Sequence, residues 1–168
     1  HLQPLTKYAM YGLGEQVHVA SWPSFCLYRG GAYALGEEVN MAASQVYAVE
    51  GGCFVLAATT VTGPAGLELF AQTDQQRELL GGGGGGSSRI YGPDGRLLTE
   101  PIPEDEEGIV YAEIDLSLIP LSKVAADPSD HHARFDLAQA LAASGDLKGA
   151  VDHLLHIVGQ LGALTGEE

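Results

Sequence analysis

The side chains of this sequence that are best suited to covalent chemistry are two cysteines, Cys26 and Cys53. Two cysteines are too few for a disulfide framework, and they lack the CxxC spacing of zinc and redox sites, which favours a reducing, cytoplasmic setting. Cys53 opens an apolar run and is expected to be a buried, unreactive thiol. Lys7 lies on the polar side of a predicted helix, so we expect it to be a surface charge.

Four histidines and two aspartates gather near the end of the chain. They are Asp127, His131, His132, Asp136, His153 and His156. His153 and His156 would share one helical face, but the spacing of the group matches no recognised zinc pattern. We therefore predict solvated polar faces, with no metal and no cofactor. His18 alternates with the apolar residues of a predicted strand and is expected to be a structural histidine.

The composition narrows the classes of function. The chain carries 22 Asp and Glu against 8 Lys and Arg, a formal net charge of -14. Nucleic acids and anionic membranes bind clustered basic residues, so neither is an expected partner. The sequence contains no run of 18 apolar residues, so no membrane span is predicted. A length of 168 residues with 45% hydrophobic content favours one main globular domain.

Helical periodicity marks two segments on either side of a predicted strand. Residues 2–14 are expected to form an amphipathic helix, and because no capping residue precedes it, we expect sequence upstream of this chain. The stretch "QVHVASWPSF" is expected to be a buried strand that runs into a loop at Pro23. Residues 38–51 return to helical period. The apolar stripe of this second helix is Val39, Ala42, Ala43, Val46 and Val49.

The middle of the chain adds a further strand, a helix and a glycine tract. "CFVLAATTV" is typical of a strand covered on both faces, and "LELFAQTDQQRELL" of one helix. The six glycines at 81–86 predict a mobile loop. The alternative, a phosphate-binding loop, is less favoured because the tract lacks the Lys-Ser/Thr ending that such loops carry. The order helix, strand, helix, strand predicts an α/β layer fold.

Two hairpins are predicted in the remainder. In "RIYGPDGRLL", Pro93 presets the turn and Gly95 takes its left-handed position, so strands are expected on both sides. "IVYAEIDL" alternates apolar and polar residues, which predicts a half-buried strand. Residues 129–168 read as two helices separated by "ASGD", which predicts a helical hairpin.

Six stretches together resemble the C-terminal half of the nitrilase branch of the carbon–nitrogen hydrolase superfamily, over residues 1–128. In order they are "HLQPLTKYAMY", "EQVHVASWPSF", "ALGEEVNMAASQVYAVEGGCFVLA", "IYGPDGRLL", "EGIVYAEIDLSLI" and "AADP". The resemblance implies a partial nitrilase-type α-β-β-α sandwich, followed by the C-terminal hairpin of residues 129–168. That hairpin is similar to the tetratricopeptide-like tail of thioredoxin-like co-chaperones.

The resemblance also implies a chemistry. Members of this family convert a nitrile into a carboxylic acid and ammonia with a Cys, a Lys and a Glu. The stretch that matches residues 1–5 follows the family's Cys-Trp-Glu, so all three groups are expected upstream and no catalytic residue is predicted in this chain. Cys26 does not match the family's nucleophile. The chain alone is therefore expected to be inactive.

The resemblance implies two roles for this chain: it lines the substrate pocket, and it contributes to a dimer interface. Trp22, Pro23 and Ser24 are predicted to line the pocket, although core packing explains Trp22 equally well. In the family, the helices that match residues 2–14 and 38–51 form a dimer face. A homo-oligomer through these helices is therefore expected, and a non-catalytic dimerisation or interaction module is the alternative function.

Overall fold

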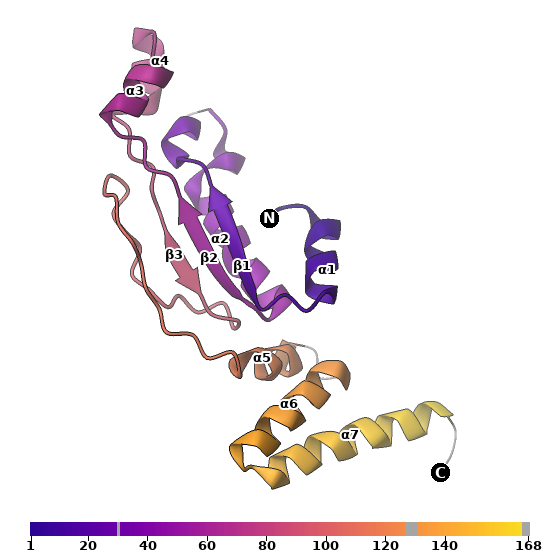
Figure 1. The fold of residues 1–168 in the computed structure, drawn as a ribbon. Coiled ribbons are helices and arrows are strands. Elements are labelled where there is room, and N and C mark those ends of the chain that lie inside the picture. The colour runs from indigo at the N-terminus through magenta and orange to yellow at the C-terminus, as the bar shows by residue number, and fades with distance from the viewer. Residues whose placement is uncertain (30, 127–130, 166–168) are drawn as a thin grey trace. The chain divides into compact units, whose positions relative to one another are not determined.

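The computed structural model describes residues 1–29, 31–126 and 131–165, and it divides into two compact units (Figure 1). Unit 1 comprises residues 1–114 and unit 2 comprises residues 115–168. The domain boundary predicted between residues 128 and 129 lies outside the described residues.

Unit 1 is built around a three-stranded sheet with the order β1-β2-β3. β1 and β2 are parallel, in a register that runs from Val17 opposite Phe54 to Trp22 opposite Thr59, and β3 is antiparallel to β2. The elements in chain order are α1 (Pro4–Gly12), β1 (Val17–Trp22), the 3-10 helices η1 (Phe25–Tyr28) and η2 (Tyr33–Leu35), α2 (Glu37–Gly51), β2 (Phe54–Thr59), α3 (Pro64–Phe70), α4 (Asp74–Leu80) and β3 (Arg89–Tyr91). The predicted α/β class is confirmed, while the sandwich stays a prediction.

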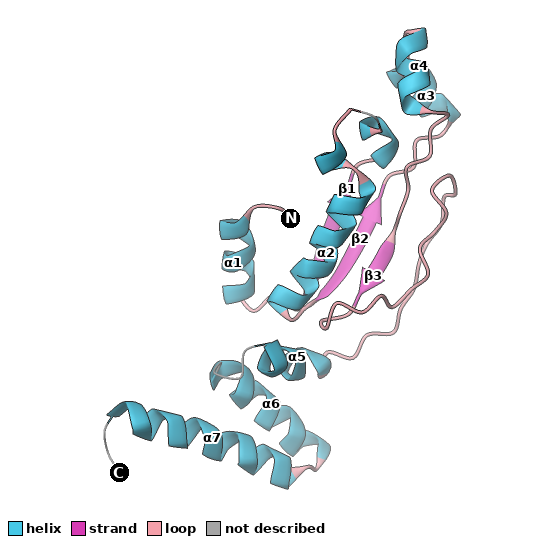
Figure 2. Cartoon of the chain, turned by 180° about the vertical axis from the view of Figure 1, so that it is seen from behind, coloured by secondary structure: helices cyan, strands magenta, loops and turns pink. Residues whose placement is uncertain are grey.

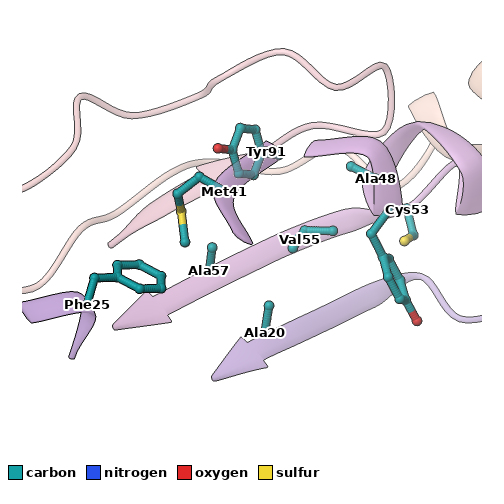
Figure 3. Packing of buried hydrophobic residues seen from close by; sticks show 9 residues of the cluster. Ala20, Phe25, Met41, Ala48, Cys53, Val55, Ala57 and Tyr91 are labelled. Atoms are coloured by element: carbon teal, nitrogen blue, oxygen red, sulfur yellow. The ribbon is translucent and has the colours of Figure 1, made fainter. Parts of the chain in front are cut away.

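Helix α2 packs against the sheet and forms the core of unit 1 with it (Figures 2 and 3). Between them they bury Ala20, Phe25, Met41, Tyr47, Ala48, Cys53, Val55, Ala57 and Tyr91. The prediction of a strand covered on both faces holds in part for β2, because Val55 is fully buried whereas Ala58 is exposed. The expected burial of β1 is wrong for Val17 and Val19, which are exposed.

The face of α2 that meets the sheet differs from the predicted stripe. Its buried residues are Asn40, Met41, Ser44, Tyr47, Ala48 and Gly51. Val46 and Val49, which belong to the predicted stripe, are exposed. Two buried polar groups of α2 donate to backbone carbonyls: the Asn40 amide to Gly36 at 2.7 Å and the Ser44 hydroxyl to Asn40 at 2.9 Å. The amide oxygen of Asn40 has no hydrogen-bond partner among the described residues.

Three other sequence-based expectations are corrected in unit 1. The single helix predicted for "LELFAQTDQQRELL" is two, because the Thr73 side chain and Gln76 form a capping box that starts α4. The turn at Gly95 is confirmed, with φ +78°, but the return segment forms only a single bridge between Tyr91 and Leu97. Residues 109–116 form no strand, and Tyr111 is 81% exposed, since this segment lacks a paired neighbour among the described residues.

Unit 2 consists of helices. They are α5 (Leu118–Ala126), α6 (His131–Ser144) and α7 (Leu147–Thr165). α6 and α7 pack against each other across the turn at Gly145, whose φ is +92°. Leu137, Ala138 and Ala150 are buried, while much of the apolar face of α7 is exposed. None of the helices in the described ranges combines the length and the apolar character needed to cross a membrane.

Candidate active site: the carboxyl ends of β1 and β2

The predicted pocket residues lie where β1 ends. Trp22 is the last residue of the strand, and its indole N–H donates to the Ser44 hydroxyl of α2 at 3.0 Å. Pro23 is exposed, and Ser24 is buried with its hydroxyl donating to the Gly84 carbonyl at 2.7 Å. Trp22 therefore has a packing role in addition to its place at the strand end, and pocket lining by these three residues stays a prediction.

The glycine tract is part of this site rather than a mobile loop, which corrects the prediction. Residues 83–86 are buried beside the segment that follows β1. The Phe25 amide donates to the Gly85 carbonyl at 2.9 Å, and Gly84 exchanges two backbone hydrogen bonds of 2.9 Å with Thr62. A Cβ on Gly85 would lie 2.2 Å from the Cys26 nitrogen. The absence of side chains thus allows the backbone of the tract to contact the segment after β1.

One arginine bonds to the tract, and a second bonds to Ser87, the residue that follows it. The Arg29 guanidinium donates to the Gly83 carbonyl at 3.0 Å and also pairs with the Glu104 carboxylate. On the other side, Arg89 pairs with Glu37 at 2.8 Å, and the Ser87 hydroxyl donates to the same carboxylate. Glu37 stands in the first turn of α2, where a carboxylate is also favoured by the helix dipole.

A cavity of about 610 Å³ opens beside this segment. Aromatic rings and carboxylates line it together with one arginine: Phe25, Tyr28, Arg29, Tyr33, Glu37, Glu38 and Glu104 are its main side chains. Trp22, Pro23 and Ser24 do not line this cavity. The hydrogen bond from Tyr33 to Glu38 raises the pKa of the Tyr33 phenol above its ordinary value. The cavity can accept a small organic molecule with an apolar body and a hydrogen-bonding end.

The two cysteines are both buried. The Cys26 thiol lies 3.0 Å from the Ser24 hydroxyl, inside the contact between the tract and η1. Cys53 belongs to the core, as the sequence predicts. This packing gives neither thiol access to a substrate.

The histidine group of unit 2 does not assemble into a metal site among the described residues. His153 contacts the Arg134 guanidinium at 3.2 Å, and the exposed side chain of His132 lies 4.0 Å from the Asp136 carboxylate. Asp127 lies outside the described residues.

His1 and His18 form a cluster beside β1 that was not predicted from the sequence. His18 was expected to be structural, and its ring does stack on Tyr47 with centroids 3.9 Å apart. It also contacts the Glu15 carboxylate at 2.8 Å and His1 at 2.7 Å. The His1 ring lies against Trp22, with centroids 4.8 Å apart. This cluster extends along β1 to the residue at its carboxyl end.

The arginine and glutamate contacts were also missed, because their partners are distant in sequence. Arg29 and Glu104 are 75 residues apart, and Glu37 and Arg89 are 52 apart. No periodicity or local motif marks such pairs. The one available signal was the placement of Glu37 next to a glycine at the start of a predicted helix.

Comparison with known proteins identifies relatives for most of the chain. The carbon-nitrogen hydrolase family model matches residues 1–123, and a tetratricopeptide repeat model matches residues 121–164. The chain is 53% identical to a nitrilase of Pseudomonas syringae pv. syringae (strain B728a) over 141 residues, which are 84% of this chain and 42% of that protein.

Two further relatives carry related names. An aliphatic nitrilase of Rhodococcus rhodochrous is 51% identical over 137 residues, which are 82% of this chain and 37% of that protein. An arylacetone-specific nitrilase of Alcaligenes faecalis is 45% identical over 134 residues, 80% of this chain and 37% of that protein. The chain thus spans about two fifths of the length of these relatives. Because the family model matches well over half of the chain, the chain belongs to the carbon–nitrogen hydrolase family.

Proposed function

We propose that this chain is the C-terminal portion of a nitrilase-type hydrolase, which converts a small-molecule nitrile into a carboxylic acid and ammonia in the cytoplasm. The observation that carries the proposal is the identity of 53% and 51% to two proteins named nitrilases, over more than four fifths of the chain. The chain matches only 42% and 37% of their lengths, so the activity is assigned to the whole protein.

In this proposal the chain lines the substrate site and does not supply its reactive groups. Trp22, Pro23 and Ser24 stand at the end of β1, and the glycine tract fixes the segment that follows them. The Cys, Lys and Glu of the family resemblance have no counterpart in this sequence. Both of its own thiols are buried. The isolated chain is therefore expected to release no ammonia.

A chimera tests the proposed function. The segment of the Pseudomonas syringae nitrilase that this chain matches is replaced by the matching residues of this chain, and ammonia release from a nitrile is measured. We expect the chimera to retain activity within about tenfold of the parent, because at this identity the barrier should change by no more than about 1.4 kcal/mol.

The controls are the parent without the exchanged segment and the isolated 168-residue chain, both of which should be inactive. A chimera that folds, as judged by circular dichroism, but hydrolyses no nitrile would count against the proposal. So would ammonia release by the isolated chain that the substitution Cys26→Ala abolishes.

A second candidate function, a dimerisation module, is favoured by the exposed apolar side chains of α1 and of Leu13, the residue that follows it. Leu5, Tyr8 and Leu13 are 86%, 77% and 81% exposed, although residues 2–14 follow an amphipathic pattern. α1 contacts α2 through the edge-to-face rings of Tyr11 and Tyr47 and leaves its apolar stripe uncovered. A second copy of the chain, meeting residues 2–14 and 38–51, would bury these side chains.

Light scattering coupled to size-exclusion chromatography measures this association. The chain is expected to elute with twice its mass of 17.6 kDa, and Leu5→Lys is expected to give a monomer because it places a charge in the interface. Leu69→Lys is the matched control, since Leu69 is 67% exposed on α3, away from these helices. A monomeric wild-type chain, or equal effects of the two substitutions, would contradict the module.

A further inference from the structure

The cluster on β1 is a chain of hydrogen bonds with one end in the core of unit 1. The Tyr47 hydroxyl donates to one oxygen of the Glu15 carboxylate at 2.6 Å, and the other oxygen lies 2.8 Å from Nδ1 of His18. Nε2 of His18 lies 2.7 Å from Nδ1 of His1. The side chains of Glu15 and His18 are only 10% and 13% exposed, so water competes little for these contacts.

The positions of the protons follow from the acceptors. An ionised carboxylate only accepts hydrogen bonds, so Nδ1 of His18 must donate to Glu15. When the His18 ring is neutral, its single proton is the one on Nδ1, so Nε2 of His18 is an acceptor. Nδ1 of His1 must then be the donor across the 2.7 Å contact. The remaining nitrogen of His1, Nε2, is left as an acceptor.

We propose that Glu15 and His18 are positioning residues that hold His1 as its Nδ1–H tautomer, with Nε2 presented as a proton acceptor beside Trp22. The proposal rests on the proposed function only for the meaning of Trp22 as a wall of the substrate site. The tautomer itself depends on the contacts along β1. In general, a hydrogen bond at one ring nitrogen of a histidine fixes the tautomer, which prepares the other ring nitrogen for proton transfer.

The surroundings of the cluster support this direction of donation. Burial and the contact with Glu15 hold the pKa of the Tyr47 phenol well above its ordinary value, so its hydroxyl stays a donor. The other titratable groups on this side of α2 are Tyr11, Glu50, Lys7 and Cys53. Tyr11 donates to Glu50 at 3.3 Å, and Lys7 forms an ion pair with Glu50 at 2.5 Å, so neither competes for Glu15.

Nitrogen-15 NMR of the imidazole rings in the full chain measures the tautomers directly. At pH 8 we expect His1 and His18 to show protonated Nδ1 and unprotonated Nε2, assigned with His1→Gln and His18→Gln variants. His132, whose side chain is 88% exposed and lies no nearer than 4.0 Å to the Asp136 carboxylate, supplies the pattern of a solvent-exposed ring. Glu15→Ala should shift His1 to the His132 pattern. Tyr47→Phe removes the other hydrogen bond to Glu15 and should leave both tautomers unchanged.

Two results would overturn the proposal, and they are separable from a failure of the proposed function. One is a proton on Nε2 of His18 in the wild-type chain, which requires no variant to fold. The other is a His1 pattern that Glu15→Ala leaves unchanged. In the nitrilase chimera, Glu15→Ala should lower kcat roughly tenfold with a smaller effect on KM. If Glu15→Ala changes the tautomer of His1 but leaves kcat of the chimera unchanged, the His1 tautomer has no role in the reaction. A chimera that is inactive without the Glu15 substitution bears on the proposed function alone.

Discussion

Replacement of Gly85 by Ala is expected to lower the free energy of unfolding of unit 1 by at least about 3 kcal/mol, because two penalties combine. Gly85 has a φ of +82°, in the left-handed region that alanine adopts at a cost. The new Cβ would also stand 2.2 Å from the Cys26 nitrogen and 2.6 Å from the Ser24 hydroxyl. Backbone atoms on both sides must move, so the contact between the tract and η1 is lost.

Gly82→Ala separates the two penalties. Gly82 has a φ of +89°, but a Cβ there meets no atom within 4 Å, so only the conformational cost of about 1 kcal/mol remains. Urea unfolding followed by the fluorescence of Trp22, the single tryptophan of the chain, reports on unit 1 for both variants. Equal losses of stability would show that the tract does not pack against the segment after β1.

The glycine tract illustrates where sequence reasoning stops. Six glycines in a row carry no side-chain pattern, and their intrinsic property is conformational freedom, which predicts mobility. The contacts that bury residues 83–86 come from Thr62, from Glu104 and from the segment of Ser24 and Phe25. These partners are distant in the chain. A glycine that is needed for close approach therefore looks, in the sequence, like a glycine that provides flexibility.

Elements with strong local signals were predictable from the sequence. β1 places Val17 and Val19 in alternation with His18, β2 is an apolar run, and both end at turn or loop residues. The turn at Gly95 depends only on its own dihedral angles. Residues 109–116 show the opposite case. Their alternation of apolar and polar residues is that of a strand, but alternation specifies a face and not a hydrogen-bonding partner. Without a neighbouring strand in the described part of the chain, the segment forms no strand and most of its residues are exposed.

Local sequence signals likewise predict only part of the candidate site. The carboxyl end of β1 and the residues Trp22 to Ser24 could be placed from the sequence, because a Pro after a strand marks its end. The chain of Glu15, His18 and His1 could not, since it needs the tautomers and the ring positions that only packing defines. His18 was predicted as a structural histidine, and its stacking on Tyr47 accounts for one of its roles only.

Because α2 turns the face that carries Tyr47 toward the sheet, a substitution of Tyr47 is expected to destabilise unit 1 strongly. Tyr47→Ala should lower the free energy of unfolding of unit 1 by about 3–5 kcal/mol, the usual cost of deleting a buried aromatic ring. Tyr47 is 1% exposed, and its ring contacts both His18 and Tyr11. Loss of the ring leaves a cavity between α2 and β1, and it removes the hydrogen bond to Glu15.

Val46→Ala is the matched control on the neighbouring residue of the same helix. Val46 belongs to the apolar stripe that the sequence favours for the core, yet it is 48% exposed, so its truncation should change stability by less than about 0.5 kcal/mol. The two variants are compared by urea unfolding with Trp22 fluorescence, and circular dichroism checks that α2 remains helical. A larger loss for Val46→Ala than for Tyr47→Ala would mean that the valine stripe, and not the face of Tyr47, meets the sheet. That result would also contradict the packing that places His18, because the ring that contacts Glu15 and His1 is stacked on Tyr47.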